Sequence, residues 1–293
     1  MNTITHQDKT FCYKTVGNKN HPCLVLVMGI TGQLINWPDT LLQDLADSGF
    51  YVLVFDNRDV GLSQYYDHVP TPSLGEVMAQ LQQGQPVTPP YSLQDMAEDI
   101  VTLLDALDIT QAHIAGVSMG GQVAQYFALA HPEKTLSLAL ISTSSGDRDL
   151  PPPSQAVMEF FFNGKPPANL QEAIERHVAQ YKLYNHPDDF NPEGARALQE
   201  KAYERAYHPE GNHRQLLAMI CAQPRGEALR ALNVPTVIVH GDCDPVFNLE
   251  HAKRLQSCIA GSRLEVIKNL GHGLPKRMHP ELIAALKRFL NII

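Results

Sequence analysis

The sequence lacks both the charge pattern of a nucleic-acid-binding protein and the long apolar runs of a membrane protein. Charged residues make up only 18 % of the 293 residues, no block of Lys or Arg is present, and the formal net charge is −8. A basic surface that grips a phosphate backbone is therefore not expected. No apolar run approaches the length that spans a bilayer. Hydrophobic residues still make up 44 % of the chain, which is typical of a folded globular protein.

Cysteine is also scarce. The five cysteines are odd in number, scattered, and contain no C-x-x-C pair; they are Cys12, Cys23, Cys221, Cys243 and Cys258. This pattern predicts free thiols in a reducing compartment. Residues 1–9 contain no apolar segment of the kind found in secretory signal peptides. We therefore expect a cytoplasmic protein, and the sequence leaves open whether it forms a homodimer.

Strand-like and helix-like segments alternate along most of the chain. The expected strands are short apolar runs at Thr10–Val16, Cys23–Met28, Tyr51–Phe55, Ala112–Ala115, Leu136–Ile141, Val234–His240 and Leu264–Ile267. Helices are expected at 38–48, from Ser92 to about Leu107, and at 122–130, 249–258 and 280–290. Residues 64–91, with five prolines, are interpreted as loop-rich, and no helix is expected there. This alternation predicts an α/β fold with a mostly parallel sheet of about eight strands and helices on both faces.

The alternation stops once. From about residue 146 to residue 228 the sequence shows four helical stretches after a Pro151-Pro152-Pro153 break, and no strand pattern. We expect a helical cap inserted into the fold. The predicted organisation is therefore a core of residues 1–145, a cap of residues 146–228, and a second core segment of residues 229–293.

The most informative stretch is Gly116-Val117-Ser118-Met119-Gly120-Gly121. It lies between an apolar strand and a helix, and strand, G-x-S-x-G and helix together form the nucleophile-elbow signature. Glycine is needed on both sides because the turn leaves no room for side chains. The positive end of the following helix favours the negative charge that develops in acyl transfer. Ser118 is therefore the candidate nucleophile.

A nucleophilic serine needs a histidine base, and the base needs an acid that orients it. His272 lies just after the last strand and is the only histidine flanked by glycine on both sides. The acid is expected after the preceding strand, and Asp244 is preferred because Asp242 lies closer to the strand end with less room to turn. Asp147 and Asp149, which follow an earlier strand, remain as alternatives to this pair.

The oxyanion of the reaction must be held by two backbone N–H groups. One is expected from Met119, the residue after the nucleophile, and the other from Ile30 in the glycine-bearing loop after the second strand. His208 and His213 are too weakly spaced to indicate a metal site, and no cofactor is expected.

On these motifs the chain resembles the α/β-hydrolases. The segment Asp56–Ser63 is similar to the D-x-R-G-x-G-x-S motif of that superfamily, with Asp59 where glycine is usual. Met28-Gly29 stands in place of the common His-Gly of the oxyanion loop. Together with Asn36–Asp39 and Gly271–Pro275, these departures resemble the aclacinomycin methyl esterase branch. The resemblance covers most of the core, supports the catalytic assignments above and fades in the insertion, where the superfamily carries its substrate-selecting cap.

The sequence thus predicts a serine hydrolase that cleaves small-molecule carboxylic esters through an acyl-enzyme. The same triad could act on a lactone, on a C–C bond next to a ketone, or in perhydrolysis. The serine disfavours haloalkane dehalogenase and epoxide hydrolase, which resemble this fold but use an aspartate nucleophile. A third hypothesis, from another class, is a hydrolase fold whose site only binds a ligand. Labelling by a fluorophosphonate distinguishes this last hypothesis from the enzyme hypotheses.

Overall fold

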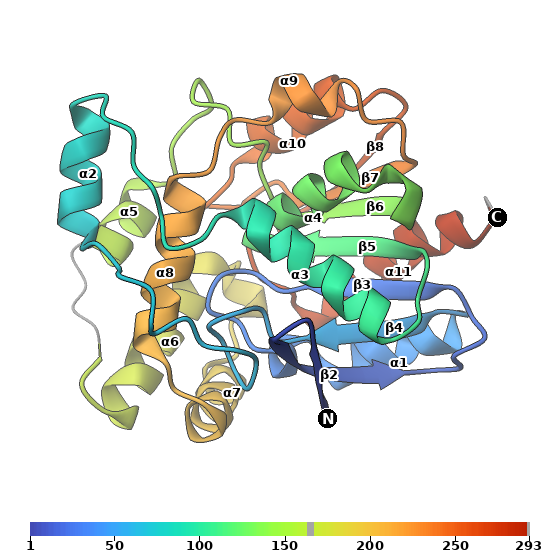
Figure 1. Ribbon diagram of the computed structural model, residues 1–293, viewed down its shortest axis with the longest axis horizontal. Helices are drawn as coiled ribbons and strands as arrows, with labels where there is room; N and C mark the ends of the chain where they lie inside the picture. The colour runs from blue at the N-terminus through green and yellow to red at the C-terminus, as the bar shows by residue number, and fades with distance from the viewer. Residues whose placement is uncertain (163–166, 292–293) are drawn as a thin grey trace.

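One eight-stranded sheet organises the fold (Figure 1). The computed structural model describes residues 1–162 and 167–291, and its strands lie in the order β1-β2-β4-β3-β5-β6-β7-β8. In this order every neighbouring pair from β4 to β8 is parallel, whereas the pairs β1–β2 and β2–β4 are antiparallel. The strands are β1 Asn2–His6, β2 Lys9–Val16, β3 Cys23–Val27, β4 Tyr51–Phe55, β5 Ala112–Val117, β6 Thr135–Ile141, β7 Thr236–Gly241 and β8 Arg263–Ile267.

Helices cover both faces of this sheet. α3 (Leu93–Ala106), α4 (Met119–Ala130) and α10 (Leu249–Cys258) share one core with Val25 and Val27 of β3. α1 (Asp39–Asp47) and α11 (His279–Lys287) share the other core with Leu24 and Leu26 of the same strand. A strand buried on both faces carries apolar side chains at every position, which explains the continuous apolar runs in the sequence. The predicted α/β class and mostly parallel sheet are confirmed.

Outside the segment between β6 and β7, one α-helix and one strand were not predicted from the sequence. The loop-rich segment 64–91 contains a helix that was not expected, α2 (Leu74–Gln82). A capping box opens this helix: Ser73 Oγ accepts from Glu76 N, and the Glu76 carboxylate accepts from Ser73 N. The prolines of this segment lie outside the helix and bound it. The second missed element is β1, which forms a hairpin with β2 across Gln7 and Asp8, both at positive φ.

The segment between β6 and β7 is helical. It contains α5 (Gln155–Phe162), α6 (Leu170–Tyr184), α7 (Pro192–Arg205), α8 (Pro209–Ile220) and α9 (Gly226–Leu229), and none of its described residues joins the sheet. In Figure 1, α5 to α8 stand beyond one end of the sheet, on the side where α2 lies. Residues 163–166 of the expected cap and 292–293 of the second core segment lie outside the described residues. None of the described helices has the length and apolar character needed to cross a bilayer.

Candidate active site

Ser118 lies at a sharp turn between β5 and α4. Its backbone has φ 56° and ψ −121°, a conformation that residues with a side chain rarely adopt. A Cβ on Gly116 would lie 2.2 Å from the carbonyl oxygen of Gly120, and a Cβ on Gly120 would lie 2.2 Å from that of Val27. The turn therefore exists only because both glycines lack a side chain. The Ser118 hydroxyl makes no capping hydrogen bond to α4, which leaves it available to other groups.

The structure brings Ser118, His272 and Asp244 into one line of hydrogen bonds. His272 Nε2 lies 2.9 Å from Ser118 Oγ, and His272 Nδ1 lies 2.7 Å from Asp244 Oδ2. The three side chains come from the loops that follow β5, β8 and β7. Because a carboxylate only accepts, Nδ1 carries the hydrogen that is donated to Asp244, and Nε2 is left to accept the hydrogen of Ser118. This is the arrangement in which a histidine activates a hydroxyl.

Asp244 is held in its charged form. Its side chain is fully buried, and its other oxygen, Oδ1, accepts the backbone N–H groups of Val246 at 2.8 Å and Phe247 at 2.9 Å. Burial by itself would raise the pKa of Asp244, but the charge and hydrogen bond of His272, the charge of His240 and the N–H of Phe247 hold its pKa below the ordinary value. A charged Asp244 stabilises an imidazolium at His272.

None of the alternative acids touches His272. Asp242 Oδ1 accepts the backbone N–H of Asn269 at 2.6 Å and so closes its own loop. Asp147 and Asp149 both pair with Arg254, at 3.1 Å and 2.7 Å. The geometry therefore favours Asp244 over all three.

The two residues expected to hold the oxyanion belong to chain segments that approach the serine. Met119 N–H belongs to the first residue of α4, where no partner exists within the helix. The loop of Ile30 approaches the serine at Gly29, where an added Cβ would lie 3.3 Å from Ser118 Cβ. Neither N–H donates to any group of the described residues. Both are therefore available to an oxyanion.

The loop of His272 rests on the end of α6, a contact that the sequence did not indicate. The backbone N–H of His272 donates to the carbonyl oxygen of Tyr184 at 2.7 Å. A Cβ on Gly271 would lie 2.0 Å from that oxygen, and a Cβ on Gly273 would lie 2.1 Å from Asn185 Oδ1. The glycines on either side of His272 thus make room for the end of α6 and the residue that follows it.

Aromatic rings enclose the imidazole. The ring of Tyr184 meets that of His272 edge-on at 5.3 Å between centroids, and Phe247 does so at 5.6 Å. Phe247 also supplies a carbonyl that accepts from the buried His240 at 2.7 Å. No motif pointed to these aromatic residues, because each depends on contacts between distant loops.

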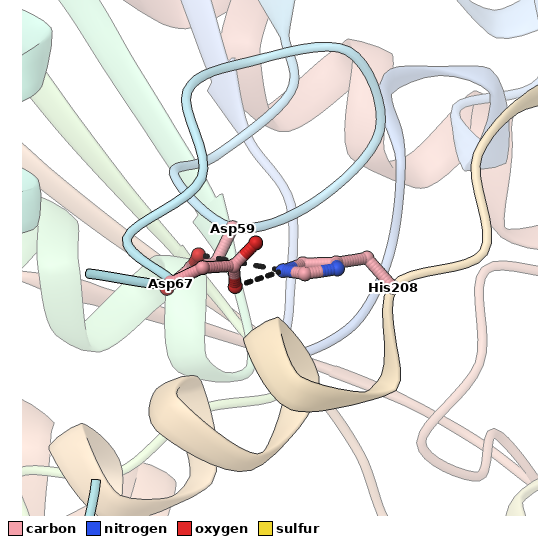
Figure 2. Close-up of side chains that lie close together, drawn as sticks. All are labelled: Asp59, Asp67 and His208. Carbon is pink, nitrogen blue, oxygen red and sulfur yellow. Dashed lines mark ion pairs between the residues drawn. The ribbon is translucent and has the colours of Figure 1, made fainter. Parts of the chain in front are cut away.

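A second group of titratable side chains joins the cap segment to the core. Figure 2 shows Asp59, Asp67 and His208 close together. Carboxylates and imidazole are metal ligands, yet Arg214 fills this place: its Nη2 lies 2.8 Å from Asp59, 2.6 Å from Asp67 and 3.1 Å from His208 Nε2. The guanidinium supplies the positive charge that a metal ion would otherwise bring. The group is an ion-pair network, and it uses Asp59, which holds φ 65° where the related motif has glycine.

The sequence of this chain is similar to those of known proteins. A family model described as alpha/beta hydrolase fold matches residues 22–275. Rhodomycin D methylesterase of a Streptomyces species is 27 % identical over 97 % of this chain and 95 % of its own. A 3-oxoadipate enol-lactonase of Acinetobacter baylyi is 22 % identical over 89 % of this chain and 86 % of its own.

Solved structures agree on the fold. The meta-cleavage product hydrolase of Pseudomonas fluorescens superposes with a TM-score of 0.77 at 19 % identity, covering 100 % of this chain and 98 % of that one. The family match, which spans most of the chain, and the shared sheet topology lead to one conclusion: this chain belongs to the α/β-hydrolase fold family.

Proposed function

We propose that this protein is a serine hydrolase of carboxylic esters, with Ser118 as nucleophile, His272 as base and Asp244 as the orienting acid. The observation that carries the proposal is the unbroken line of hydrogen bonds from Asp244 to His272 to Ser118 at the top of a strained turn. The methylesterase relative supports an ester as the substrate.

Each step of the proposed reaction uses a group with a defined place. Ser118 Oγ attacks the ester carbonyl while His272 Nε2 takes its proton, and the N–H groups of Ile30 and Met119 hold the oxyanion. His272 then gives the proton to the leaving alcohol, and an acyl-enzyme remains on Ser118. Water, activated by His272, attacks the acyl-enzyme and releases the acid.

We also propose that residues 146–228 act as a cap. The support is that α5 to α8 lie outside the sheet and that α6 touches the loop of His272. A cap in this place excludes bulk water from the reacting groups and shapes the space for the substrate.

A second candidate reaction uses the same residues on a neighbouring electrophile. The enol-lactonase relative supports a lactone, whose ring carbonyl is attacked as an ester carbonyl is. A panel of methyl esters, p-nitrophenyl esters and lactones of graded size separates the two candidates by the ratio of kcat/KM. Higher kcat/KM for lactones than for open-chain esters of equal size favours the second candidate.

The central test is the Ser118→Ala variant. Removal of the nucleophile is expected to lower kcat by about 10⁴- to 10⁶-fold and to abolish labelling by a fluorophosphonate, with the fold unchanged. The matched control is Ser145→Ala, at a nearby buried serine that bonds Asp147. Retention of more than about one tenth of the turnover in Ser118→Ala would remove Ser118 from the mechanism.

One expectation is kept with this proposal. A cytoplasmic location is supported by five free thiols, and it is checked by fractionation of the source cells. Whether the protein forms a homodimer is a separate question, which sedimentation of the purified protein decides.

A further inference from the structure

The cap segment is fastened to the core on one side by buried polar contacts. Arg205 of α7 pairs with the fully buried Asp56 at 2.7 Å, and Arg214 of α8 pairs with the fully buried Asp59 at 2.8 Å. Gln215 of α8 accepts the N–H of Thr31 at 2.8 Å, next to the oxyanion residue Ile30. Breaking a buried ion pair costs several kcal/mol, so these contacts are not expected to open for a substrate.

A cavity of about 330 Å³ lies at the C-terminal end of α8. Its apolar wall comes from Leu81 of α2, Met219 and Ile220 of α8, and Phe247. A second cavity of about 280 Å³ shares Leu81 and Ile220 with it and continues toward Pro86 and Val87. The two together form a groove between α2 and the last turn of α8.

The groove begins beside the candidate triad. Phe247, which lines the groove, meets the ring of His272. Gln122 lines it one turn after Ser118 and donates its backbone N–H to Ser118 O at 3.3 Å. Thr143, the neighbour of the lining residue Ser144, donates its hydroxyl to the same oxygen at 2.6 Å. Because Gln122 and Thr143 are hydrogen-bonded to the backbone carbonyl of Ser118, the groove lies next to the residue that would carry the acyl group.

The polar lining of the groove is positive in a chain of net charge −8. Arg225 is 2 % exposed, and all its hydrogen-bond acceptors among the described residues are neutral groups. Arg148 is exposed, lines both cavities and pairs with no described residue. Asp147, the acidic residue of the lining, is already paired with Arg254. An anion is the group that complements this lining.

We propose that the groove between α2 and α8 binds the acyl part of the substrate, and that this acyl part is an apolar chain with a carboxylate at its far end. The preferred substrate is then a half-ester of a dicarboxylic acid. Leu81, Met219, Ile220 and Phe247 contact the chain, and Arg148 meets the carboxylate at the rim. The inference rests on the proposed function, since it specifies the substrate of the same serine.

The first experiment tests the charge. Monomethyl esters of dicarboxylic acids of graded length are compared with the matching methyl esters that end in a neutral carboxamide. The half-ester is expected to have a kcat/KM about five- to tenfold higher at low salt, and this preference is expected to shrink as ionic strength rises. In Arg148→Ala the preference is expected to fall to about twofold or less, and in Arg148→Glu it is expected to reverse.

The control is Arg196→Glu, at an exposed arginine of α7 that lines neither cavity. It changes the net charge as Arg148→Glu does and is expected to keep the preference. Equal kcat/KM for the half-ester and the carboxamide in the wild type overturns the proposal of an anionic substrate. The proposal is also overturned if Arg196→Glu loses the preference for the half-ester as much as Arg148→Glu does. Such a result leaves the esterase proposal intact, whereas turnover by Ser118→Ala contradicts the esterase proposal itself.

The second experiment tests the place. Leu81→Trp fills the groove at a half-buried position that tolerates a larger side chain. It is expected to lower kcat/KM about tenfold for long acyl chains while p-nitrophenyl acetate changes by less than about twofold. Leu62→Trp, at a leucine that is 49 % exposed and lines none of these cavities, is the control. If the loss of kcat/KM in Leu81→Trp depends on the length of the alcohol, the assignment of the groove to the acyl part is wrong. It is also wrong if p-nitrophenyl acetate loses as much kcat/KM as the long acyl esters do.

Discussion

Two aspartates on the loop after β7 have different partners, although one residue separates them in the sequence. Asp242 and Asp244 are separated by one position after β7, yet only the second reaches His272, at 2.7 Å. The Asp242 carboxylate instead accepts the backbone N–H of Asn269. Two backbone N–H groups turn the Asp244 carboxylate and bond its far oxygen. The role of each aspartate follows from which groups the loop brings to it.

Asp244→Asn is expected to lower kcat about 10⁴-fold, because an amide at this position stabilises neither the correct imidazole tautomer nor an imidazolium. Asp242→Asn is expected to change kcat by less than about threefold, since its amide oxygen can still accept from Asn269. Both variants are measured on one activated ester, together with Asp147→Asn. If Asp244→Asn stays active while Asp242→Asn or Asp147→Asn loses activity, the role of the acid belongs to that other aspartate. The roles of Ser118 and His272 are not affected by such a result.

At the scale of elements, the end of α6 and the loop of His272 act as one unit. Arg277, a few residues after His272, grips Asp189 beyond the end of α6 with two hydrogen bonds of 2.6 and 2.7 Å. The same guanidinium donates to the carbonyl oxygens of Lys268 and Asn269. It therefore ties the cap segment to the loop that carries the base.

Arg277→Gln is expected to lower kcat about tenfold with less than about a threefold change in KM, because a misplaced base slows the chemical step more than binding. Arg277→Lys should recover part of the loss through its remaining charge. Lys253→Gln, which breaks the exposed pair with Glu250, is the control. A rise in KM with unchanged kcat would mean that this contact shapes only substrate binding.

The ion-pair network around Asp59 holds α8 against the core. Arg214→Leu leaves the fully buried Asp59 carboxylate without its guanidinium, so the free energy of unfolding is expected to fall by about 3–5 kcal/mol. The exposed pair of Arg230 and Glu227 provides the control, and Arg230→Leu should cost less than about 0.5 kcal/mol. Chemical denaturation measures both. A loss in Arg214→Leu no larger than in the control would show that Asp59 is stable without an ion pair.

At the scale of the whole molecule, the core contains histidines that resist protonation. His113 is 1 % exposed, bonds Ser137 through Nδ1 at 2.7 Å, and lies against the rings of Phe50 and Phe289. Burial lowers the pKa of His113 to about 4. Burial also lowers the pKa of His240 and that of His251. These groups make the stability of the fold depend on pH.

Between pH 6.5 and about 4 the unfolded chain binds a proton at residue 113 that the folded chain does not. The unfolded state therefore binds more protons in this window, and the free energy of unfolding falls as the pH falls. His113 alone is expected to account for about 3 kcal/mol of this loss between pH 7 and pH 4. His113→Asn, which can keep the bond to Ser137, is expected to flatten the dependence.

The measurement is urea denaturation at several pH values, with His21→Asn as the control at an exposed histidine. Parallel curves for the wild type and His113→Asn over this window would show that His113 is protonated as easily in the folded chain as in the unfolded one.

The sequence by itself predicted most of the sheet and the order of the site residues. Continuous apolar runs identify strands buried on both faces, and helical periodicity with capping residues identifies helices, because these signals are local. The turn at Ser118 is local only in part, because Gly116 is required by its contact with Gly120, whereas Gly120 is required by its contact with Val27 of β3. The helix α2 carried such a signal in Ser73 and Glu76, and the surrounding prolines hid it.

Only the tertiary structure decided which groups meet. Ser118 and His272 are 154 positions apart, and Asp244 is 28 positions from His272. The contact of Tyr184 with the loop of His272 and the groove between α2 and α8 depend on how helices pack against strand ends. Local signals determine which elements form, but contacts between distant segments depend on the packing of the entire chain, and no local pattern records that packing.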